Sequence, residues 1–347
     1  MTNIQQKLAA LTADCIRFKS IDAPAYREEL HRVVAWVAAR FKKLPGVYVR
    51  RFFVQEKPGL VVTFERALEK PTVFLNGHLD VVPGEQHQFS PTIRNGRLYG
   101  RGAYDMKGAC AVMIALAEHF AKQEKKPDVG FMFVTDEEAQ GDQSEMLFKS
   151  GYHPKLFIAV EPTDFTIVTE TKGILWVEGK IPGKAAHGSE PWLGRSPLVG
   201  FYDGLRKFYQ CFPTLRRKQW VTTANIGEVR SGDCYNRIPP DLTFKIDMRY
   251  VSKDDPRVFM QKVKRSFPDN TQWKIERCDP PHRKAKDMVL IRQLKKIADG
   301  ARVPTRYGRA PFATDARFFS AGGIASAVFG PKGGGAHSAD EWVEIAG

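Results

Sequence analysis

The chain has 347 residues, of which 43% are hydrophobic, and it carries a formal net charge of +14 at pH 7. This length exceeds what one compact domain usually needs, so we expect two domains. No run of about 18 apolar residues is present, and the N-terminus lacks the basic segment and apolar stretch of a signal peptide, so we expect neither membrane insertion nor export.

The cysteines and the positive charge narrow the function only a little. The five cysteines are scattered and lack CxxC spacing, which indicates neither a disulfide framework nor a thiolate metal site and favours a cytoplasmic protein. A positive potential attracts nucleic acids, anionic surfaces and anionic substrates alike. The basic stretches lack the interleaved aromatic residues of a single-strand platform, so we favour a solvated basic face over a nucleic-acid partner.

The first half of the chain alternates between two apolar patterns. Helical spacing covers residues 3–19, 26–43 and 107–123, and short β-rich or continuous apolar runs cover residues 59–64, 72–75, 129–134 and 156–160. Continuous apolar strands separated by helices predict an α/β/α structure. Its mixed, largely parallel sheet would be buried on both faces.

From about residue 173 the order changes to strand, helix, strand, strand, helix, strand. The ranges are 174–181, 196–211, 221–229, 241–249, 255–267 and 272–277. This order is typical of a ferredoxin-like α+β domain. After a helical pattern at 289–300, residues 311–337 resemble the first domain again. We therefore predict one domain made of residues 1–172 and 285–347, with residues 173–284 inserted into it.

Polar residues follow the predicted strand at 72–75. His78 and Asp80 lie two residues apart, which would place both side chains on one face of an extended strand. A histidine that binds a metal commonly donates its other N–H to a neighbouring carboxylate or carbonyl. The pair alone is a weak signal, because a buried histidine more often just hydrogen-bonds its neighbour.

Asp105 lies in Gly100–Gly108, a glycine-rich turn that leads into a helix. Such a turn can cradle phosphate, but it matches neither GxxxxGK[ST] nor the full GxGxxG spacing. An aspartate can instead use its two oxygens to bridge two cations.

The strands at 129–134 and 156–160 are followed by carboxylates. Glu137 and Glu138 leave the first strand in different directions, so that one can bind a metal while the other faces a water molecule. Glu161 follows the second strand, and His337 lies in a late glycine-rich loop. Open α/β sheets place their sites at these carboxyl ends. One histidine and one carboxylate on each side of a shared aspartate is what a two-metal hydrolase requires.

Five segments in this order resemble the zinc aminoacylase and carboxypeptidase family of metallopeptidases: GHLDVVPG, GRGAYDMKG, TDEEAQG, VEPTD and GAHSADE. Members include acetylornithine deacetylase, succinyl-diaminopimelate desuccinylase, aminoacylase and glutamate carboxypeptidase. The resemblance spans nearly the whole chain. It implies two Zn²⁺ ions, with Co²⁺ or Mn²⁺ as alternatives.

The same resemblance assigns the residues of the first domain. His78 and Glu161 would hold one zinc ion and Glu138 and His337 the other, with Asp105 bridging them. Glu137 would be the general base, and Asp80 would orient His78. A cis peptide bond is implied between Asp105 and Met106.

In the inserted domain, three further residues match the family. His187, in GKAAHGSEP, resembles a histidine that helps bind the scissile carbonyl oxygen, often across a dimer. Asn236 and Arg249 resemble residues that hold the substrate carboxylate, for which the planar guanidinium is well suited. Thr314, after the inserted domain, belongs to a similar pocket loop. The resemblance also implies a homodimer formed through the inserted domain.

We expect a hydrolase that removes an acyl group, acetyl first, from an N-acyl amino acid. Glutamate at position 161 resembles the deacylases more than the peptidases, and Ala-Thr-Asp-Ala-Arg-Phe departs from the desuccinylase pattern Thr-Ser-Asp-Gly-Arg-Phe. A dipeptidase or carboxypeptidase acting on short peptides is the alternative. A binding protein on an inactive metallohydrolase fold is the third hypothesis, but such a protein should have lost a ligand or the base.

Overall fold

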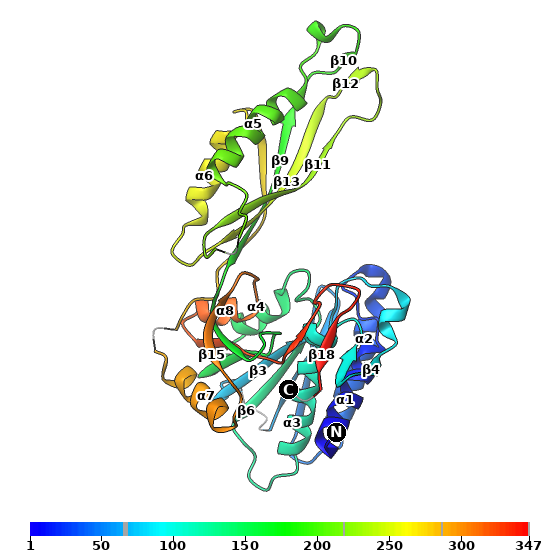
Figure 1. Cartoon of the computed structure of the whole chain (residues 1–347), viewed down its shortest axis with the longest axis vertical. Coiled ribbons are helices and arrows are strands. Elements are labelled where there is room, and N and C mark those ends of the chain that lie inside the picture. Colours follow the sequence, from blue (N-terminus) through cyan, green and yellow to red (C-terminus); the bar gives the residue numbers. More distant parts are fainter. Residues whose placement is uncertain (65–68, 218, 286, 346–347) are drawn as a thin grey trace. The chain divides into compact units, whose positions relative to one another are not determined.

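The computed structural model describes residues 1–64, 69–217, 219–285 and 287–345, and the chain divides into two compact units (Figure 1). The large unit comprises Met1–Glu170, His282–Arg309 and Thr314–Gly347, and the small unit comprises Thr171–Pro281 and Ala310–Ala313. Each unit has its own hydrophobic core. Within the described ranges, every helix falls short of the length and hydropathy that crossing a bilayer demands.

The large unit is built on an eight-stranded mixed sheet in the order β1-β2-β6-β3-β7-β16-β8-β15. Its strands are β1 (Tyr48–Val54), β2 (Lys57–Thr63), β3 (Val73–His78), β6 (Val129–Val134), β7 (Leu156–Ala159), β8 (Thr166–Thr171), β15 (Arg306–Ala310) and β16 (Ala325–Val328). The central strands β6, β3, β7 and β16 pair in parallel, whereas β1, β2 and β8 pair antiparallel with their neighbours. The carboxyl ends of the four parallel strands therefore meet at one edge.

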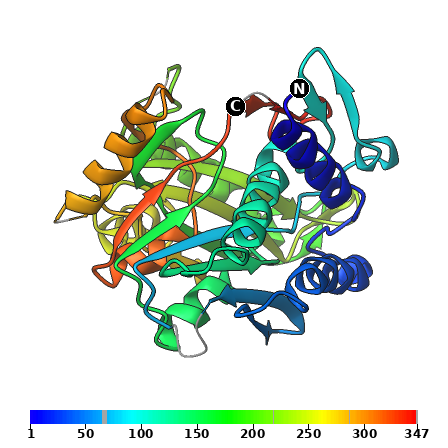
Figure 2. The ribbon, with the colours of Figure 1, turned by 90° about the horizontal axis from the view of Figure 1, so that it is seen from below.

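Helices cover both faces of this sheet. Leu75 lies beside Phe131 and Ile158 in the register, so these three side chains share one face. That face packs against α1 (Asn3–Ile16), α2 (Arg27–Phe41), α3 (Gly108–Phe120) and α7 (Val289–Gly300). Figure 2 shows α1 in dark blue beside α3 in teal, and their contact confirms this arrangement.

The opposite face carries Phe157, because successive strand residues point to opposite sides. Its ring stacks on Phe319 with centroids 3.8 Å apart, and Phe319 also meets Phe148 edge-on. These contacts hold α4 (Asp142–Lys149) and α8 (Ala316–Ala321) on this face. The predicted α/β/α class is confirmed.

The small unit has the predicted ferredoxin-like topology. Its elements are β9 (Gly173–Pro182), α5 (Pro197–Cys211), β11 (Thr223–Ser231), β13 (Asp241–Tyr250), α6 (Pro256–Ser266) and β14 (Gln272–Asp279). The four strands form an antiparallel sheet in the order β11-β13-β9-β14. Phe201 and Phe208 from α5 pack on Phe244 and Phe267 in its core. A separate ribbon pairs β10 (Ala186–His187) with β12 (Arg237–Ile238).

Several parts of the large unit were not predicted, including β8, β15, β16, α4 and α8. Two others are the edge strand β1 and a second sheet. The edge strand β1 is mostly exposed, so it lacks the apolar signal of the buried strands. A second sheet, in the order β17-β18-β5-β4, joins β17 (Gly333–Gly334) and β18 (Trp342–Glu344) to β5 (Arg97–Tyr99) and β4 (Thr92–Arg94). This sheet holds residues 342–344 beside the glycine-rich turn. Single-turn helices complete the chain at η1 (Pro24–Tyr26), η2 (Gln86–Phe89), η3 (Ala103–Lys107) and η4 (Pro191–Leu193).

Candidate metal centre

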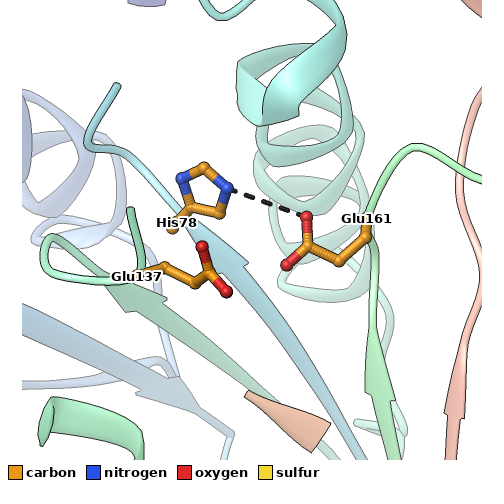
Figure 3. A group of neighbouring side chains, drawn as sticks. All are labelled: His78, Glu137 and Glu161. Carbon is orange, nitrogen blue, oxygen red and sulfur yellow. Dashed lines mark ion pairs between the residues drawn. The ribbon is translucent and has the colours of Figure 1, made fainter. Parts of the chain in front are cut away.

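The parallel strands bring several of the predicted site residues together. His78 is the last residue of β3, Glu137 follows β6, and Glu161 follows β7. Since β6, β3 and β7 are neighbours, their carboxyl ends present these side chains to a common space. Figure 3 shows the three side chains pointing toward one another from these strand ends.

One half of the cluster forms around His78, which is almost fully buried. Its Nε2 lies 3.2 Å from Oδ1 of Asp105 and 3.7 Å from Oε2 of Glu161. Its Nδ1 lies 3.0 Å from the main-chain oxygen of Asp80. Because a carbonyl oxygen only accepts, Nδ1 carries the proton in the neutral ring, and the Nε2 lone pair faces the carboxylates.

The other half forms around His337, which is half-exposed. Its Nε2 lies 3.2 Å from Oδ2 of Asp105 and 3.2 Å from Oε2 of Glu138. The two carboxylate oxygens of Asp105 therefore face different histidines. The Asp105–Met106 peptide bond is cis, which confirms the expectation drawn from the resemblance.

Asp80 is fully buried behind these residues. Its Oδ2 accepts a 3.0 Å hydrogen bond from the main-chain N–H of Glu138, whereas its Oδ1 lies 3.6 Å from Nδ1 of His78. Asp80 thus contacts His78 mainly through its own backbone and fixes the segment that carries Glu138 through its side chain.

The donor set fits metal cations. Oε1 of Glu138 and Oε1 of Glu161 are buried and have no hydrogen-bond partner among the described residues, an arrangement that is costly unless a cation compensates the charge. Ligand atoms of His78, Asp105 and Glu138 lie within 4.8 Å of one another, as do those of His78, Glu137 and Glu161. Imidazole nitrogen and carboxylate oxygen are ligands that zinc accepts.

Burial and mutual contact shift the pKa values of the cluster. Burial raises the pKa of Glu161 to about 7 and raises that of Glu137 well above its usual range, and the charge of Glu161 adds to the latter. Hydrogen bonds to Asp105 and Glu138 raise the pKa of His337 to about 10. Burial opposes the ionised form of Asp105, but hydrogen bonds from His337 and His78 hold its pKa below its usual range. Metal-free protein therefore holds protons where a cation would bind.

Comparison with known families decides the class. Residues 74–347 match the model of Peptidase family M20/M25/M40. The chain belongs to this family. It is accordingly a metallohydrolase that acts on amide bonds.

Two curated relatives within the family illustrate its range. The chain is 28% identical over 313 residues to a succinyl-diaminopimelate desuccinylase of Coxiella burnetii, with 80% of each protein covered. It is 27% identical over 227 residues to a probable carboxypeptidase of Aspergillus terreus, which covers 58% of this chain. The match spans 52% of the length of that fungal protein, or about half.

Solved structures share the fold of this family member. An aminopeptidase from Bacillus cereus superposes with a TM-score of 0.79 at 18% identity, covering 99% of this chain and 94% of its own. An M20 family metallo-carboxypeptidase from Sulfolobus solfataricus gives a TM-score of 0.77 at 18% identity, covering 100% and 96%. At these identities the likeness concerns the fold.

The remaining predicted residues of this M20/M25/M40 member are divided between the two units. His187, Asn236 and Arg249 belong to the small unit, where the N–H of Gly188 donates to the main-chain oxygen of Asn236 at 2.7 Å. Nε of Arg249 donates to both oxygens of Asp247, at 2.8 and 3.1 Å. Thr314, in the large unit, is fully buried, and its hydroxyl has no hydrogen-bond partner among the described residues.

Sequence reasoning missed the polar residues that hold the cluster from behind. Ser144 donates to Asp315 at 2.5 Å, and Arg317 donates to the main-chain oxygen of Gln140 at 2.8 Å, beneath the loop that carries Glu137. On the other side, Arg101 and Glu341 form a buried ion pair at 2.7 Å. Both lie in segments that resemble the family, GRGAYDMKG and GAHSADE, but nothing local in the sequence indicates that they pair.

Proposed function

We propose that the protein is a zinc-dependent amidohydrolase that removes an acyl group, acetyl first, from N-acyl amino acids. The observation that carries the proposal is the placement of Asp105, whose two oxygens face His78 and His337 separately. A carboxylate shared in this way, with a further carboxylate beside each histidine, is suited to two cations.

The cluster supplies a ligand set for each ion. His78 and Glu161 would hold one zinc ion, His337 and Glu138 would hold the other, and Asp105 would serve both, with Co²⁺ or Mn²⁺ as alternatives. When bound, such a pair supplies Lewis acidity, which lowers the pKa of water and polarises a carbonyl oxygen.

Glu137 is the residue that moves the proton in this proposal. It is half-buried, lies beside His78 and Glu161, and forms no hydrogen bond or ion pair among the described residues, so its carboxylate is free to accept. Its raised pKa suits a group that takes a proton from the attacking water and returns it to the leaving amine. The amide C–N bond then breaks as the nitrogen receives that proton.

His187 is proposed to donate a hydrogen bond to the oxygen of the scissile carbonyl. Its Nδ1 accepts from the main-chain N–H of Ser189 at 3.2 Å, so the neutral ring carries its proton on Nε2. A donor aimed at a developing oxyanion lowers the barrier by roughly 3–4 kcal/mol.

Asn236 and Arg249 are proposed to bind the substrate carboxylate. Asp247 fixes the Nε side of the Arg249 guanidinium, while its two terminal nitrogens have no such partner in the described part of the chain. A guanidinium fixed in this way suits bidentate recognition of a carboxylate. Thr314 stays a prediction from the resemblance.

The proposal includes a homodimer formed through the small unit. Val199 and Tyr202 on α5 are 64% and 66% exposed, and Trp192 just before this helix is 74% exposed. Apolar side chains exposed together are typical of a protein contact. Sedimentation of the full chain, compared with a Tyr202→Glu variant, tests this assembly.

The relatives support a second candidate. The probable carboxypeptidase among the curated relatives favours a peptidase, whereas the desuccinylase match favours a deacylase with a larger acyl group. Glutamate at position 161 in Glu-Pro-Thr is the reason we place the deacylase first.

One panel of substrates separates these activities. Zinc-loaded protein is incubated with N-acetyl and N-succinyl derivatives of the same amino acids and with simple dipeptides, and amine release is measured. We expect the acetyl derivatives to be hydrolysed fastest. Dipeptide cleavage alone would establish the peptidase, faster succinyl release would establish a desuccinylase, and no release from any substrate would refute an amidohydrolase.

A further inference from the structure

The carboxylate of Glu341 is buried against the turn that carries Asp105. Its Oε1 accepts hydrogen bonds from the main-chain N–H groups of Tyr104 and Asp105, both at 3.0 Å. Its Oε2 accepts from the N–H of Gly102 at 2.9 Å and from Arg101 at 2.7 Å. One side chain thus binds three main-chain N–H groups of the turn, including that of Asp105 itself.

Arg101 extends the same network to the loop that carries His337. One of its terminal nitrogens bonds to Glu341, and the other donates to the main-chain oxygens of His337 and Pro83, both at 3.3 Å. Gln88 adds hydrogen bonds to the main-chain oxygens of Ser338 and Ala339, at 3.0 and 3.3 Å.

The other hydrogen bonds that the backbone of this loop makes among the described residues join its own members, Ser338 to Gly335 and Asp340 to Ser338, and do not tie it to the rest of the protein. Residues 335–340 are all exposed, and His337 has a φ of 63°, in the left-handed region that non-glycine residues rarely adopt. A histidine on an exposed loop would sample many positions unless its backbone were tied to the body of the protein. The hydrogen bonds from Arg101 and Gln88 supply that tie.

We propose that Glu341, Arg101 and Gln88 are positioning residues that hold Asp105 and His337 at the spacing required by the metal ion on the His337 side. This inference rests on the proposed metal centre and deepens it. The Asp105 turn and the His337 loop are far apart in the sequence. The ion pair between Arg101 and Glu341, which joins them, spans 240 positions. None of the three residues supplies a ligand. Glu341 and Arg101 act through the backbone of Asp105 and His337, and Gln88 acts through the two residues that follow His337.

The network also explains why these groups are buried as ions. A carboxylate and a guanidinium taken out of water are stabilised only when most of their hydrogen-bonding capacity is used. Glu341 accepts four hydrogen bonds from the described residues. Glutamine at this position would present an amide N–H₂ to groups that themselves donate, so at least one of these bonds would be lost.

Zinc and cobalt titrations of Glu341→Gln and Gln88→Met test the inference. Partners of metal ligands typically change metal affinity by about 10–100-fold when replaced. Of the two bound ions, we expect the one that wild-type protein binds less tightly to bind each variant at least about 10-fold more weakly still. With cobalt, each variant should also show an altered visible spectrum. Glu344→Gln, on the strand β18 that directly follows Glu341, and Gln86→Met, in the same single-turn helix as Gln88, are the matched controls and should bind like wild type.

The melting temperature of the metal-free protein separates positioning from simple stability. If Glu341→Gln and Gln88→Met lower this melting temperature but bind zinc and cobalt with wild-type affinity, the inference is wrong. If Glu341→Gln fails to fold, Gln88→Met decides, because it leaves the ion pair intact. Wild-type protein that binds no metal would refute the proposed function together with the inference, whereas wild-type affinity in the variants would refute the inference alone.

Discussion

Replacing Glu137 with glutamine should abolish most turnover while leaving the metal centre in place. Glutamine keeps the shape of the side chain but cannot accept the proton of the attacking water. General-base catalysis contributes about 10²–10⁴-fold in rate. At about 1.4 kcal/mol per factor of ten, this corresponds to a loss of roughly 3–5 kcal/mol of transition-state stabilisation, seen in kcat.

The same change should not weaken the fold. An oxygen of Glu137 lies within 4.8 Å of the ligand atoms of His78 and Glu161. Two carboxylates 4.8 Å apart repel by about 3.5 kcal/mol at an effective dielectric constant near 20, and by more at a shorter distance. Folding raises the pKa of Glu137, so above a pH of about 4.5 the unfolded chain loses this proton while the folded protein keeps it. The free energy of unfolding of the wild type therefore falls as the pH rises from about 4.5 toward the pKa of the folded state.

Three measurements on one preparation check this prediction. Steady-state amine release gives kcat, metal analysis gives zinc per chain, and thermal unfolding of metal-free protein at pH 5 and pH 7 gives stability. We expect lower kcat, unchanged zinc, and a melting temperature that is higher than wild type at pH 7. The control is Glu145→Gln, since Glu145 pairs with Lys149 on the exposed side of α4. Activity within about ten-fold of wild type would refute the role of Glu137.

Further predictions concern protons and the small unit. The pKa values of His78 and His337 are raised, that of His337 to about 10. Zinc binding should therefore release protons at pH 7, and the affinity for zinc should increase as the pH rises. Calorimetry in buffers of different ionisation enthalpy measures this proton release. Equal heats in all buffers would contradict this. Burial lowers the pKa of His282 to about 4, so folded protein stays unprotonated where the unfolded chain takes up a proton. The free energy of unfolding should therefore fall by roughly 3 kcal/mol as the pH falls from about 6.5 to 4. In urea unfolding of metal-free protein, His282→Gln should remove this dependence on pH, and an unchanged dependence would contradict the prediction. His187→Ala should lower kcat by about 10²–10³-fold without changing the zinc content, and a parallel loss of zinc would assign His187 a different role.

The parallel core and the positions of the candidate ligands at its strand ends could be predicted from the sequence because burial on both faces produces continuous apolar runs. The runs before His78, Glu138 and Glu161 are β3, β6 and β7, and their polar residues stand out because they interrupt apolar segments. The strand β3 extends further than its apolar signal, to His78 itself, because the sheet on both sides supplies its hydrogen bonds.

The residues that hold the cluster could not be assigned in the same way. Arg101 and Glu341 pair only because β18 lies beside β5, and a pairing of such distant segments leaves no periodic pattern in either one. Asp80 was expected to orient His78, and its main-chain oxygen contacts the ring. Its carboxylate also bonds to the backbone of Glu138, and that contact depends on the neighbouring strand and was not foreseen. Local spacing thus predicts ligands but not the groups that position them.

The most direct test of the account is the return of activity to metal-free protein. Amine release from the best N-acyl amino acid is measured on chelator-treated protein while zinc is added back and zinc per chain is determined in parallel. The account predicts no turnover without metal and a plateau when two zinc ions are bound per chain. Full activity in chelator-treated protein that contains no metal would contradict it.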